Sequence, residues 1–430
     1  MTEAAGGVFT PNGEPDIVII VTCSITSAAG AKTRKIIRRT RRESPAAVIA
    51  ACGCGVEELS LNEAGSLGAD IIIGNRIKHR IPEILERYFS EGRFKNEPQD
   101  KKNELLIVKA SAGESEEWDA LSLDRPRIRT RAFIKIQDGC SRRCSYCVVP
   151  RVRGKETSRS ARAVAEEAAR VAASGCREVI LTGIHLGGYN DYEKNTLAAL
   201  VRLLSRVKGL SRLRLGSLEP FALSEDLLRA LAESEIFCPH LHLPLQSGDD
   251  EVLSRMRRGY DARAFLRNAE RVRRALGDMT HISTDLIVGF PGETDAAFEN
   301  SLKVMEEAGI GRAHIFPFSA RQGTDAASMG GIVPPPVIKE RARLAGTSAN
   351  ESLSRYARRF VGEKDAVLAE ETGERFLSGW TRHYLRCVTE KGECDNIGNE
   401  ISVWPEAEKR GVLLGGGVSP EAADAFDNDS

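Results

Sequence analysis

The sequence predicts an α/β protein in three parts: an amino-terminal α/β domain with a Rossmann-like pattern, a partial (β/α)6 barrel, and a small carboxyl-terminal β-barrel. The chain has 430 residues, which is too many for one ordinary hydrophobic core. Strand and helix patterns alternate six times from about residue 131, and past Gly362 they give way to short alternating segments separated by turns. The expected parts are an amino-terminal domain, a linker, the barrel, the terminal β domain and an acidic tail, at residues 1–90, 91–125, 126–357, 358–417 and 418–430.

Three apolar runs in the amino-terminal part read as strands of an α/β domain. DIVIIVT leads to Cys23, AVIAA leads to Cys54, and ADIIIG forms the third run, with a basic helical stretch after the first. Both cysteines therefore follow the ends of strands, and open α/β sheets bind ligands at that edge. The polar residues that follow are expected to form a linker.

Six apolar segments separated by helical patterns predict the partial barrel. The strands are expected at AFIKIQ, REVILTG, RLRLGSL, PHLHLPL, HISTDLIVG and RAHIFPF. Consecutive βα units build a parallel sheet, and such folds carry their sites at the carboxyl ends of the strands. Three prolines, Pro334 to Pro336, precede a long amphipathic helix expected over 337–360.

Composition narrows the class of protein. Hydrophobic residues make up 41% of the chain and charged residues 28%, as in ordinary soluble domains. The 61 basic and 61 acidic side chains cancel, so only local charge can indicate a polyanionic partner. No apolar run has the length of a membrane span, and the start has no signal-peptide pattern. We therefore expect a cytoplasmic protein without a membrane partner.

The ten cysteines are expected to be thiols, because disulfides are rare in the cytosol. In DGCSRRCSYC, Cys140, Cys144 and Cys147 follow the first barrel strand directly. Three thiolates on one loop can hold three corners of a cubane iron–sulfur cluster and leave one iron open to another ligand. The alternative is zinc, but structural zinc takes a fourth ligand, and no cysteine or histidine lies close by in the sequence.

This triad, with Tyr146 before its last cysteine, resembles the radical S-adenosylmethionine superfamily. The chain resembles its methylthiotransferases from Asp16 to about Gly416, through FIKIQDGCSRRCSYCVVPRVRGKETSRS, EVILTGIHLGGY, LRLGSLEP, HLHLPLQSGDDEVLSRMRRGY, ISTDLIVGFPGETDAAF and HIFPFSARQGT. IQDGC, CSYC and PHLHLPLQSG are most similar to the branch acting on N6-threonylcarbamoyladenosine 37 of tRNA. The resemblance implies a [4Fe–4S] cluster whose open iron binds S-adenosylmethionine, which electron transfer cleaves to a 5′-deoxyadenosyl radical.

The resemblance also implies where S-adenosylmethionine is bound. The segment from Thr182 to Gly187 matches the part that meets the methionine amino group, and two later glycines match a turn near the adenine. The matching positions are Thr182, Gly183, Gly187, Glu219, Gln246, Ser247, Gly289 and Gly292. Glycine permits close backbone approach, and polar side chains anchor one end of a ligand. Two of these positions have structural alternatives: Gly292 as part of a Pro-Gly turn and Gln246 as a helix cap.

A second cluster in the amino-terminal domain is also implied, held by three cysteines and used in sulfur transfer. Cys23 and Cys54 match its second and third positions, but the strand and helix that would carry the first are not matched by MTEAAGGVFTPNGEPD. The ligand set is incomplete, because two thiolates do not make a three-thiolate site. We expect the natural start to lie upstream; loss of this cluster is the alternative. Cys52 shares a side of an extended strand with Cys54 and could be recruited.

The remaining cysteines, and as one alternative a pair of histidines, are expected to have structural roles. Four cysteines lack metal spacing and are expected to be packing residues: Cys176, Cys238, Cys387 and Cys394. His240 and His242 alternate with leucines, so one face of their strand carries both imidazoles. In the barrel lumen they could aid substrate binding, and a hydrogen-bonded structural role is the alternative.

Local charge predicts a nucleic-acid surface. Residues 125–162 contain twelve lysines and arginines against two acids, and AKTRKIIRRTRR has no acid. A solvated helix face is the alternative for the second block. The terminal β segment resembles the TRAM domain, a small RNA-binding barrel, and its GWTRHYLRCV interleaves aromatic and basic residues. Trp380 and Tyr384 in it are alternatively core residues.

Together, the motifs predict a tRNA methylthiotransferase that inserts a methylthio group at C2 of N6-threonylcarbamoyladenosine 37. The expected partners are the anticodon region of tRNA and an electron donor such as flavodoxin or ferredoxin. The alternatives are N6-isopentenyladenosine or a ribosomal-protein aspartate as the substrate, or a non-catalytic iron–sulfur RNA-binding protein. The sequence assigns no catalytic residue and leaves the sulfur source and oligomeric state open.

Overall fold

The computed structural model describes residues 15–23, 27–57, 59–91, 105–110, 130–392 and 395–419. The chain divides into two compact units. The first contains residues up to 122 together with 139–157 and 319–327, and the second contains the rest. None of the helices in the described part is long and apolar enough to cross a membrane.

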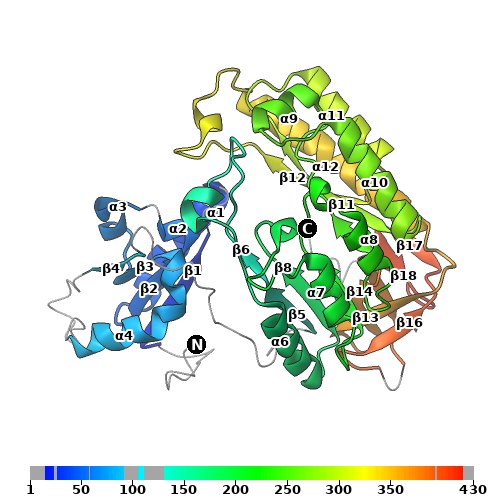
Figure 1. Cartoon of the computed structure of the whole chain (residues 1–430), viewed down its shortest axis with the longest axis horizontal. Helices are drawn as coiled ribbons and strands as arrows, with labels where there is room; N and C mark the ends of the chain where they lie inside the picture. The colour runs from blue at the N-terminus through cyan, green and yellow to red at the C-terminus, as the bar shows by residue number, and fades with distance from the viewer. Residues whose placement is uncertain are drawn as a thin grey trace. The chain divides into compact units, whose positions relative to one another are not determined.

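A four-stranded parallel sheet forms the centre of the first unit (Figure 1). Its strands lie in chain order: β1 (Ile17–Thr22), β2 (Val48–Gly53), β3 (Ile71–Ile73) and β4 (Leu106–Val108). One apolar cluster packs the sheet against η1 (Asn75–Arg80) and α4 (Ile81–Ser90). A second packs its other face against α1 (Ser27–Glu43) and α3 (Leu61–Gly65). The three expected strands are confirmed, and two short helices complete the unit: α2 (Cys54–Glu57) and α5 (Val149–Arg153).

Strand β4 lies within the stretch that was expected to be a linker. Its apolar run is short and is preceded by charged residues, so the sequence carries no periodic strand pattern there. Pairing with β3, in which Ile71 aligns with Leu106, stabilises it as the fourth strand. Tertiary pairing therefore outweighs the weak local signal.

Six parallel strands build the second unit and confirm the six strands expected from the sequence. They form two sheets of three, β5 (Arg131–Lys135), β8 (Glu178–Thr182) and β9 (Arg212–Leu215), then β10 (His240–His242), β11 (His281–Val288) and β12 (Arg312–Pro317). Isolated bridges, such as the one from Ser217 to His242, join the two sheets. Among the described residues β5 and β12 do not pair, so the barrel is partial.

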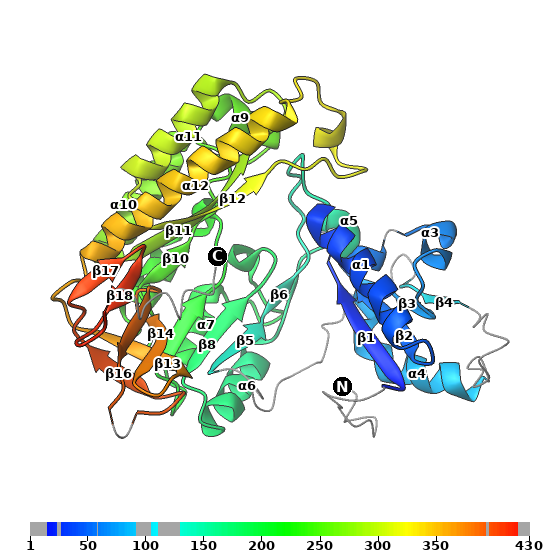
Figure 2. The same cartoon turned by 180° about the vertical axis from the view of Figure 1, so that it is seen from behind.

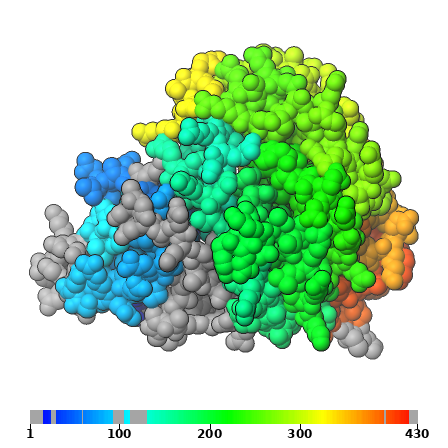
Figure 3. Space-filling view, viewed as in Figure 1, coloured from blue at the N-terminus to red at the C-terminus, as the bar shows by residue number. Residues whose placement is uncertain are grey.

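Helices alternate with these strands and bury their outer face in one apolar core. They are α6 (Ala161–Ala173), α7 (Leu197–Leu204), α8 (Glu225–Ala232), α9 (Asp250–Met256), α10 (Ala262–Leu276) and α11 (Asp295–Glu307). Shorter elements are β6 (Gln137–Asp138), β7 (Thr157–Ser158), η2 (Leu186–Gly188), η3 (Pro220–Ala222) and η4 (Asp325–Ser328). In Figure 3 the green atoms, which include those of α7, form a continuous surface on the face shown.

The long helix α12 (Pro335–Arg358) runs beside β12 and leads to a six-stranded mixed sheet (Figure 2). In spatial order its strands are β16 (Glu400–Val403), β13 (Asp365–Thr372), β14 (Phe376–Thr381), β15 (Arg386–Glu390), β18 (Val412–Leu414) and β17 (Ala407–Lys409). The end strands do not pair within the described residues, so the sheet stays open where a small barrel was expected. Tyr356 and Phe360 pack against its apolar side chains, which gives the sheet a cover without closure.

Two buried arginines of β9 connect the barrel strands to this terminal sheet by hydrogen bonds. Arg212 donates to the carbonyl oxygens of Trp380 at 2.8 Å and Ala366 at 2.6 Å. Arg214 donates to the carbonyl oxygen of Thr381 at 2.6 Å and to Glu178 at 3.0 Å. Each guanidinium is almost fully buried with its N–H groups paired, the condition under which a buried charge is tolerated. These arginines are therefore structural.

Candidate cluster sites and an arginine-lined cavity

The predicted cysteine triad lies on one loop of the first unit, between β6 and α5. Cys140, Cys144 and Cys147 are all partly exposed. The amide of Cys140 donates to the carbonyl oxygen of Gly154 at 3.1 Å, and the amide of Cys147 donates to the carbonyl oxygen of Cys144 at 3.1 Å. These hydrogen bonds fold the loop into a tight turn. Three soft thiol donors within eight residues, accessible from one loop, fit the three-cysteine set of an iron–sulfur cluster with an open iron.

Gly139 is required immediately before this loop. Its φ is +72°, and a Cβ there would lie 1.9 Å from the carbonyl oxygen of Lys155. Both the backbone conformation and the contact exclude a side chain. The loop conformation therefore depends on a glycine in DGC as well as on the three cysteines.

Cys23 and Cys54 come together at the carboxyl edge of the first unit's sheet. Each directly follows one of two paired residues, Thr22 at the end of β1 and Gly53 at the end of β2. Cys23 is exposed, whereas Cys54 is 3% exposed and packs against Val148 and Val152. The register thus brings the two predicted ligands to adjacent strand ends.

Cys52 does not join this pair, contrary to the period-two expectation. The strand ends at Gly53, whose φ is +102°, and Cys54 already belongs to α2. Cys52 instead packs in the apolar cluster beneath α4, where burial raises the pKa of its thiol. The amino-terminal sheet therefore supplies two ligands in its described part, and they do not complete a three-thiolate site.

The strand-end segment that begins at Thr182 is organised by a residue that the sequence did not single out. The buried Gln137 side chain accepts hydrogen bonds from the amides of Ile184 at 3.0 Å and His185 at 2.7 Å. Its Nε2 donates to the Asp138 carbonyl oxygen at 2.9 Å. Thr182 itself is the last, partly exposed residue of β8. The sequence signal that could have identified Gln137 is its place as a polar residue at the carboxyl end of the first expected barrel strand.

The predicted glycines occupy tight places in the second unit. A Cβ on Gly183 would lie 3.0 Å from Gln137, and one on Gly187 would lie 2.2 Å from Ala222. The backbone φ is +78° at Gly289 and +88° at Gly292. The Gly292 amide donates to the Gly331 carbonyl oxygen at 2.7 Å. Gly292 therefore makes the turn that was its structural alternative.

The three polar candidates have partners within the fold. Glu219 forms an ion pair with the buried Arg258. Ser247 is fully buried, and its hydroxyl accepts from the Asp249 amide at 3.2 Å. Gln246 has a φ of +66° and bridges to β11 through its backbone. The cap of the next helix is Asp249, so the alternative reading of Gln246 as a cap is wrong.

The packing interpretation of the other cysteines is supported where the structure describes them. Cys176, Cys238 and Cys387 are buried, and burial raises the pKa of each thiol. Cys394 lies outside the described residues. These thiols therefore stay protonated and are poor metal ligands.

Trp380 and Tyr384 are packing residues where the terminal sheet meets the barrel strands. Their rings stack at 4.6 Å, and Tyr384 also stacks on His240 at 4.6 Å. Trp380 is 5% exposed, and the guanidinium of Arg312 lies over its ring at 5.3 Å. The structure therefore supports the prediction that both are core residues.

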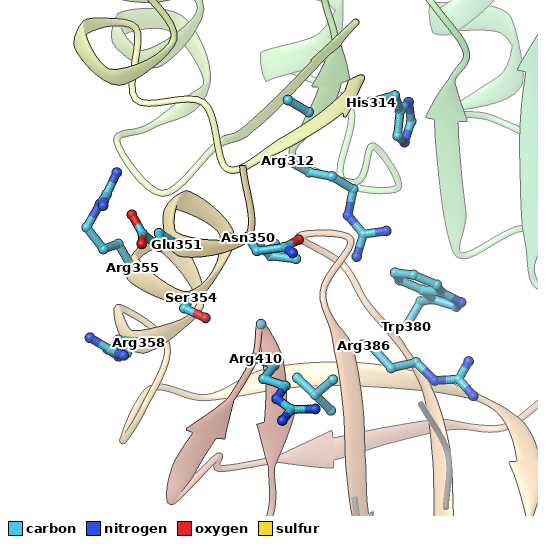
Figure 4. Close-up of a pocket in the computed structure, with 14 residues that line it drawn as sticks. Arg312, His314, Asn350, Glu351, Ser354, Arg355, Arg358, Trp380, Arg386 and Arg410 are labelled. Atoms are coloured by element: carbon cyan, nitrogen blue, oxygen red, sulfur yellow. The ribbon is translucent and has the colours of Figure 1, made fainter. Parts of the chain in front are cut away.

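A cavity of about 860 Å³ opens beside β12, α12 and the terminal sheet (Figure 4). Five arginines line it and are labelled in the figure: Arg312, Arg355, Arg358, Arg386 and Arg410. Glu351 is the one acidic residue among its lining residues in the described chain. Guanidinium groups match the planar geometry of phosphate and carboxylate. Two of the five already pair with carboxylates of the protein: Arg386 with Glu371 at 2.6 Å and Arg358 with Glu408 at 3.1 Å. We refer to this cavity as the arginine-lined cavity.

Comparison with known proteins identifies the family. A model described as the radical SAM superfamily matches residues 134–305, and one described as uncharacterized protein family UPF0004 matches residues 2–74. The threonylcarbamoyladenosine tRNA methylthiotransferase MtaB of Bacillus subtilis (strain 168) is 32% identical over 90% of this chain and 85% of its own length. The protein of that name from Thermotoga maritima is 34% identical over 89% of this chain and 85% of its own length.

Two further similarities extend the comparison. The tRNA-2-methylthio-N(6)-dimethylallyladenosine synthase of Legionella pneumophila (strain Corby) is 32% identical over 90% of this chain and 83% of its own length. The radical S-adenosylmethionine methyltransferase TsrM from Kitasatospora setae, solved with cobalamin and a [4Fe-4S] cluster, has a TM-score of 0.56 and 19% identity. That match covers 73% of this chain and 66% of TsrM, and it concerns the fold.

The partial barrel and its cysteine loop define a radical S-adenosylmethionine enzyme. More narrowly, the chain belongs to the tRNA methylthiotransferases of that superfamily, because relatives more than 30% identical align along most of both lengths. Membership implies a [4Fe–4S] cluster, S-adenosylmethionine and a tRNA substrate.

Proposed function

We propose that the enzyme places a methylthio group on C2 of N6-threonylcarbamoyladenosine at position 37 of tRNA. The observation that supports this most is the similarity to relatives named for that substrate, at 32% and 34% identity over about nine tenths of this chain. Relatives named for dimethylallyladenosine reach 33% identity, so the nucleoside has to be tested directly.

In this proposal Cys140, Cys144 and Cys147 hold the radical cluster. When bound, the cluster supplies an open iron for S-adenosylmethionine and the electron that generates a 5′-deoxyadenosyl radical. The chain's own contribution is to hold three thiolates on the Gly139 loop. In the second unit, Gln137 fixes the backbone that follows Thr182. A flavodoxin or ferredoxin is the proposed electron donor.

The proposed S-adenosylmethionine contacts lie at strand ends of the second unit. They are Thr182, Gly183, Gly187, Glu219, Gln246, Ser247, Gly289 and Gly292. The backbone at the glycines supports close approach of a ligand. Ser247 and Glu219 are held at these strand ends by their partners in the fold, the Asp249 amide and Arg258.

A second cluster is proposed at Cys23 and Cys54, with a ligand set that these two thiols do not complete. Iron and sulfide analysis of the anaerobically reconstituted chain tests it. About eight irons per chain would support two clusters, and about four would leave only the radical site.

The function is tested with the reconstituted enzyme, S-adenosylmethionine, a low-potential reductant and anticodon stem-loop RNA. Mass spectrometry of the digested nucleosides should show 2-methylthio-N6-threonylcarbamoyladenosine. The product should be absent when the RNA carries unmodified adenosine. Methylthiolation of N6-isopentenyladenosine alone would overturn the proposed substrate.

A further inference from the structure

Three strands of the partial barrel place a histidine–aspartate–histidine cluster on one face of their sheet. His242 ends β10, and Asp285 of β11 pairs in register with His314 of β12. His242 Nε2 lies 3.1 Å from one carboxylate oxygen of Asp285, and His314 Nδ1 lies 3.2 Å from the other. Leu241 and Leu286, which alternate with these residues, pack in the core. The cluster therefore occupies the face opposite the core.

The hydrogen bonds indicate where the protons of this cluster lie. Burial raises the pKa of Asp285, but hydrogen bonds from His242 and His314 outweigh it and hold that pKa below its usual range. The carboxylate is therefore ionised and only accepts. The Ser283 hydroxyl lies 3.0 Å from His242 Nδ1. When the hydroxyl donates there, His242 carries its proton on Nε2 and donates it to Asp285.

Asp285 consequently fixes the orientation of His314. Both of its oxygens accept from a ring, and the rings of His242 and His314 stack at 5.5 Å. Because His314 uses Nδ1 toward Asp285, its Nε2 is the ring atom left for a ligand. A divalent cation is the alternative occupant, because three donor atoms lie within 4.8 Å of one another.

His314 leads from this cluster to the arginine-lined cavity. Its side chain is 53% exposed and lines that cavity together with Arg312. Arg312 and His314 are two residues apart on β12, so their side chains point to the same face. Arg312 carries N–H groups, and His314 donates from Nε2 when both of its ring nitrogens carry a proton, so a carboxylate that reaches the two residues from the cavity meets hydrogen-bond donors.

We propose that Arg312 and His314 bind the carboxylate of the nucleoside's N6 substituent and so make the enzyme prefer a carboxylate-bearing substituent to a hydrocarbon one. This inference rests on the proposed function and assigns its substrate choice to named residues. A carboxylate supplies acceptors for a guanidinium and for an imidazolium ring that donates from Nδ1 to Asp285 and from Nε2 to the ligand. An isopentenyl group would displace water from the same groups without replacing its hydrogen bonds, and a site built for polar contacts rejects such an analogue.

The test compares stem-loop RNAs that differ only in the N6 substituent: threonylcarbamoyl, its neutral methyl ester, and isopentenyl. The wild-type enzyme should prefer the carboxylate form by kcat/KM. His314→Gln should lower kcat/KM for that form by about 10- to 100-fold and leave the ester nearly unchanged. Asp285→Asn should act in the same direction with a smaller loss, because it is a positioning residue.

Arg355→Gln is the matched control, since Arg355 lines the cavity from α12. The three RNAs have the same phosphates, so a contact between Arg355 and phosphate would be lost equally for all of them. This variant should therefore lower kcat/KM by the same factor for each RNA. Equal losses for His314→Gln would overturn the proposal in favour of phosphate binding or a structural role. Stoichiometric Mn²⁺ binding to the reconstituted wild type that Asp285→Asn removes would overturn it in favour of a cation site. A wild-type enzyme that modifies none of the RNAs would instead overturn the proposed function.

Discussion

Two groups of cysteines in the first unit are assembled in different ways. Cys140, Cys144 and Cys147 share one loop, so their spacing in the sequence already brings them together. Cys23 and Cys54 meet only because β1 and β2 pair with Thr22 beside Gly53. In the described part of the chain the loop supplies three thiols, whereas the paired strand ends supply two. The arrangement of thiols on one loop is therefore independent of strand register, whereas the arrangement of thiols on two strand ends depends on it.

The largest effect, on radical formation, is expected when one of the three loop cysteines is replaced. Cys144→Ala leaves two thiolates, which do not hold a cluster with an open iron. Formation of 5′-deoxyadenosine from S-adenosylmethionine should fall by at least about a thousandfold, because the radical chemistry has no other source. Chromatography after reduction with dithionite measures it. Ser141→Ala, in the same loop, should retain the wild-type rate. Full activity of Cys144→Ala would exclude the triad as the cluster site.

Removing one of the two strand-end cysteines should separate methylthio transfer from 5′-deoxyadenosine formation. Cys54→Ala should abolish methylthio transfer, because the proposed second cluster loses a ligand, while 5′-deoxyadenosine still forms. Nucleoside mass spectrometry and 5′-deoxyadenosine assays on the same samples measure the two products. Cys52→Ala, two residues earlier in β2, is the matched control: it should cost about 1 kcal/mol of unfolding free energy and keep both activities. Loss of methylthio transfer in Cys52→Ala would place Cys52 in the ligand set.

The sequence predicts local sets of residues better than sets that depend on pairing. The six barrel strands and the cysteine triad follow from patterns within short segments. Strand β4 was missed because its strand state depends on pairing with β3. The prediction that Cys52 and Cys54 lie on the same side of one strand was wrong, because the strand ends at Gly53, between them. Gln137 was missed because its role depends on amides from a distant strand end.

The smallest of these effects is expected at the glycine that starts the loop. Gly139→Ala places a Cβ against the Lys155 carbonyl oxygen, so the loop must shift and the three thiols lose their arrangement. Iron content and 5′-deoxyadenosine formation should both fall, by about tenfold for the rate. Gly175→Ala is the matched control, because Gly175 has a φ of +94° but no neighbouring atom within 4 Å of an added Cβ. It carries the backbone strain without the clash and should cost about 1 kcal/mol of stability with normal iron content. Equal iron loss in both variants would show that a general loss of stability, and not the contact with Lys155, removes the iron.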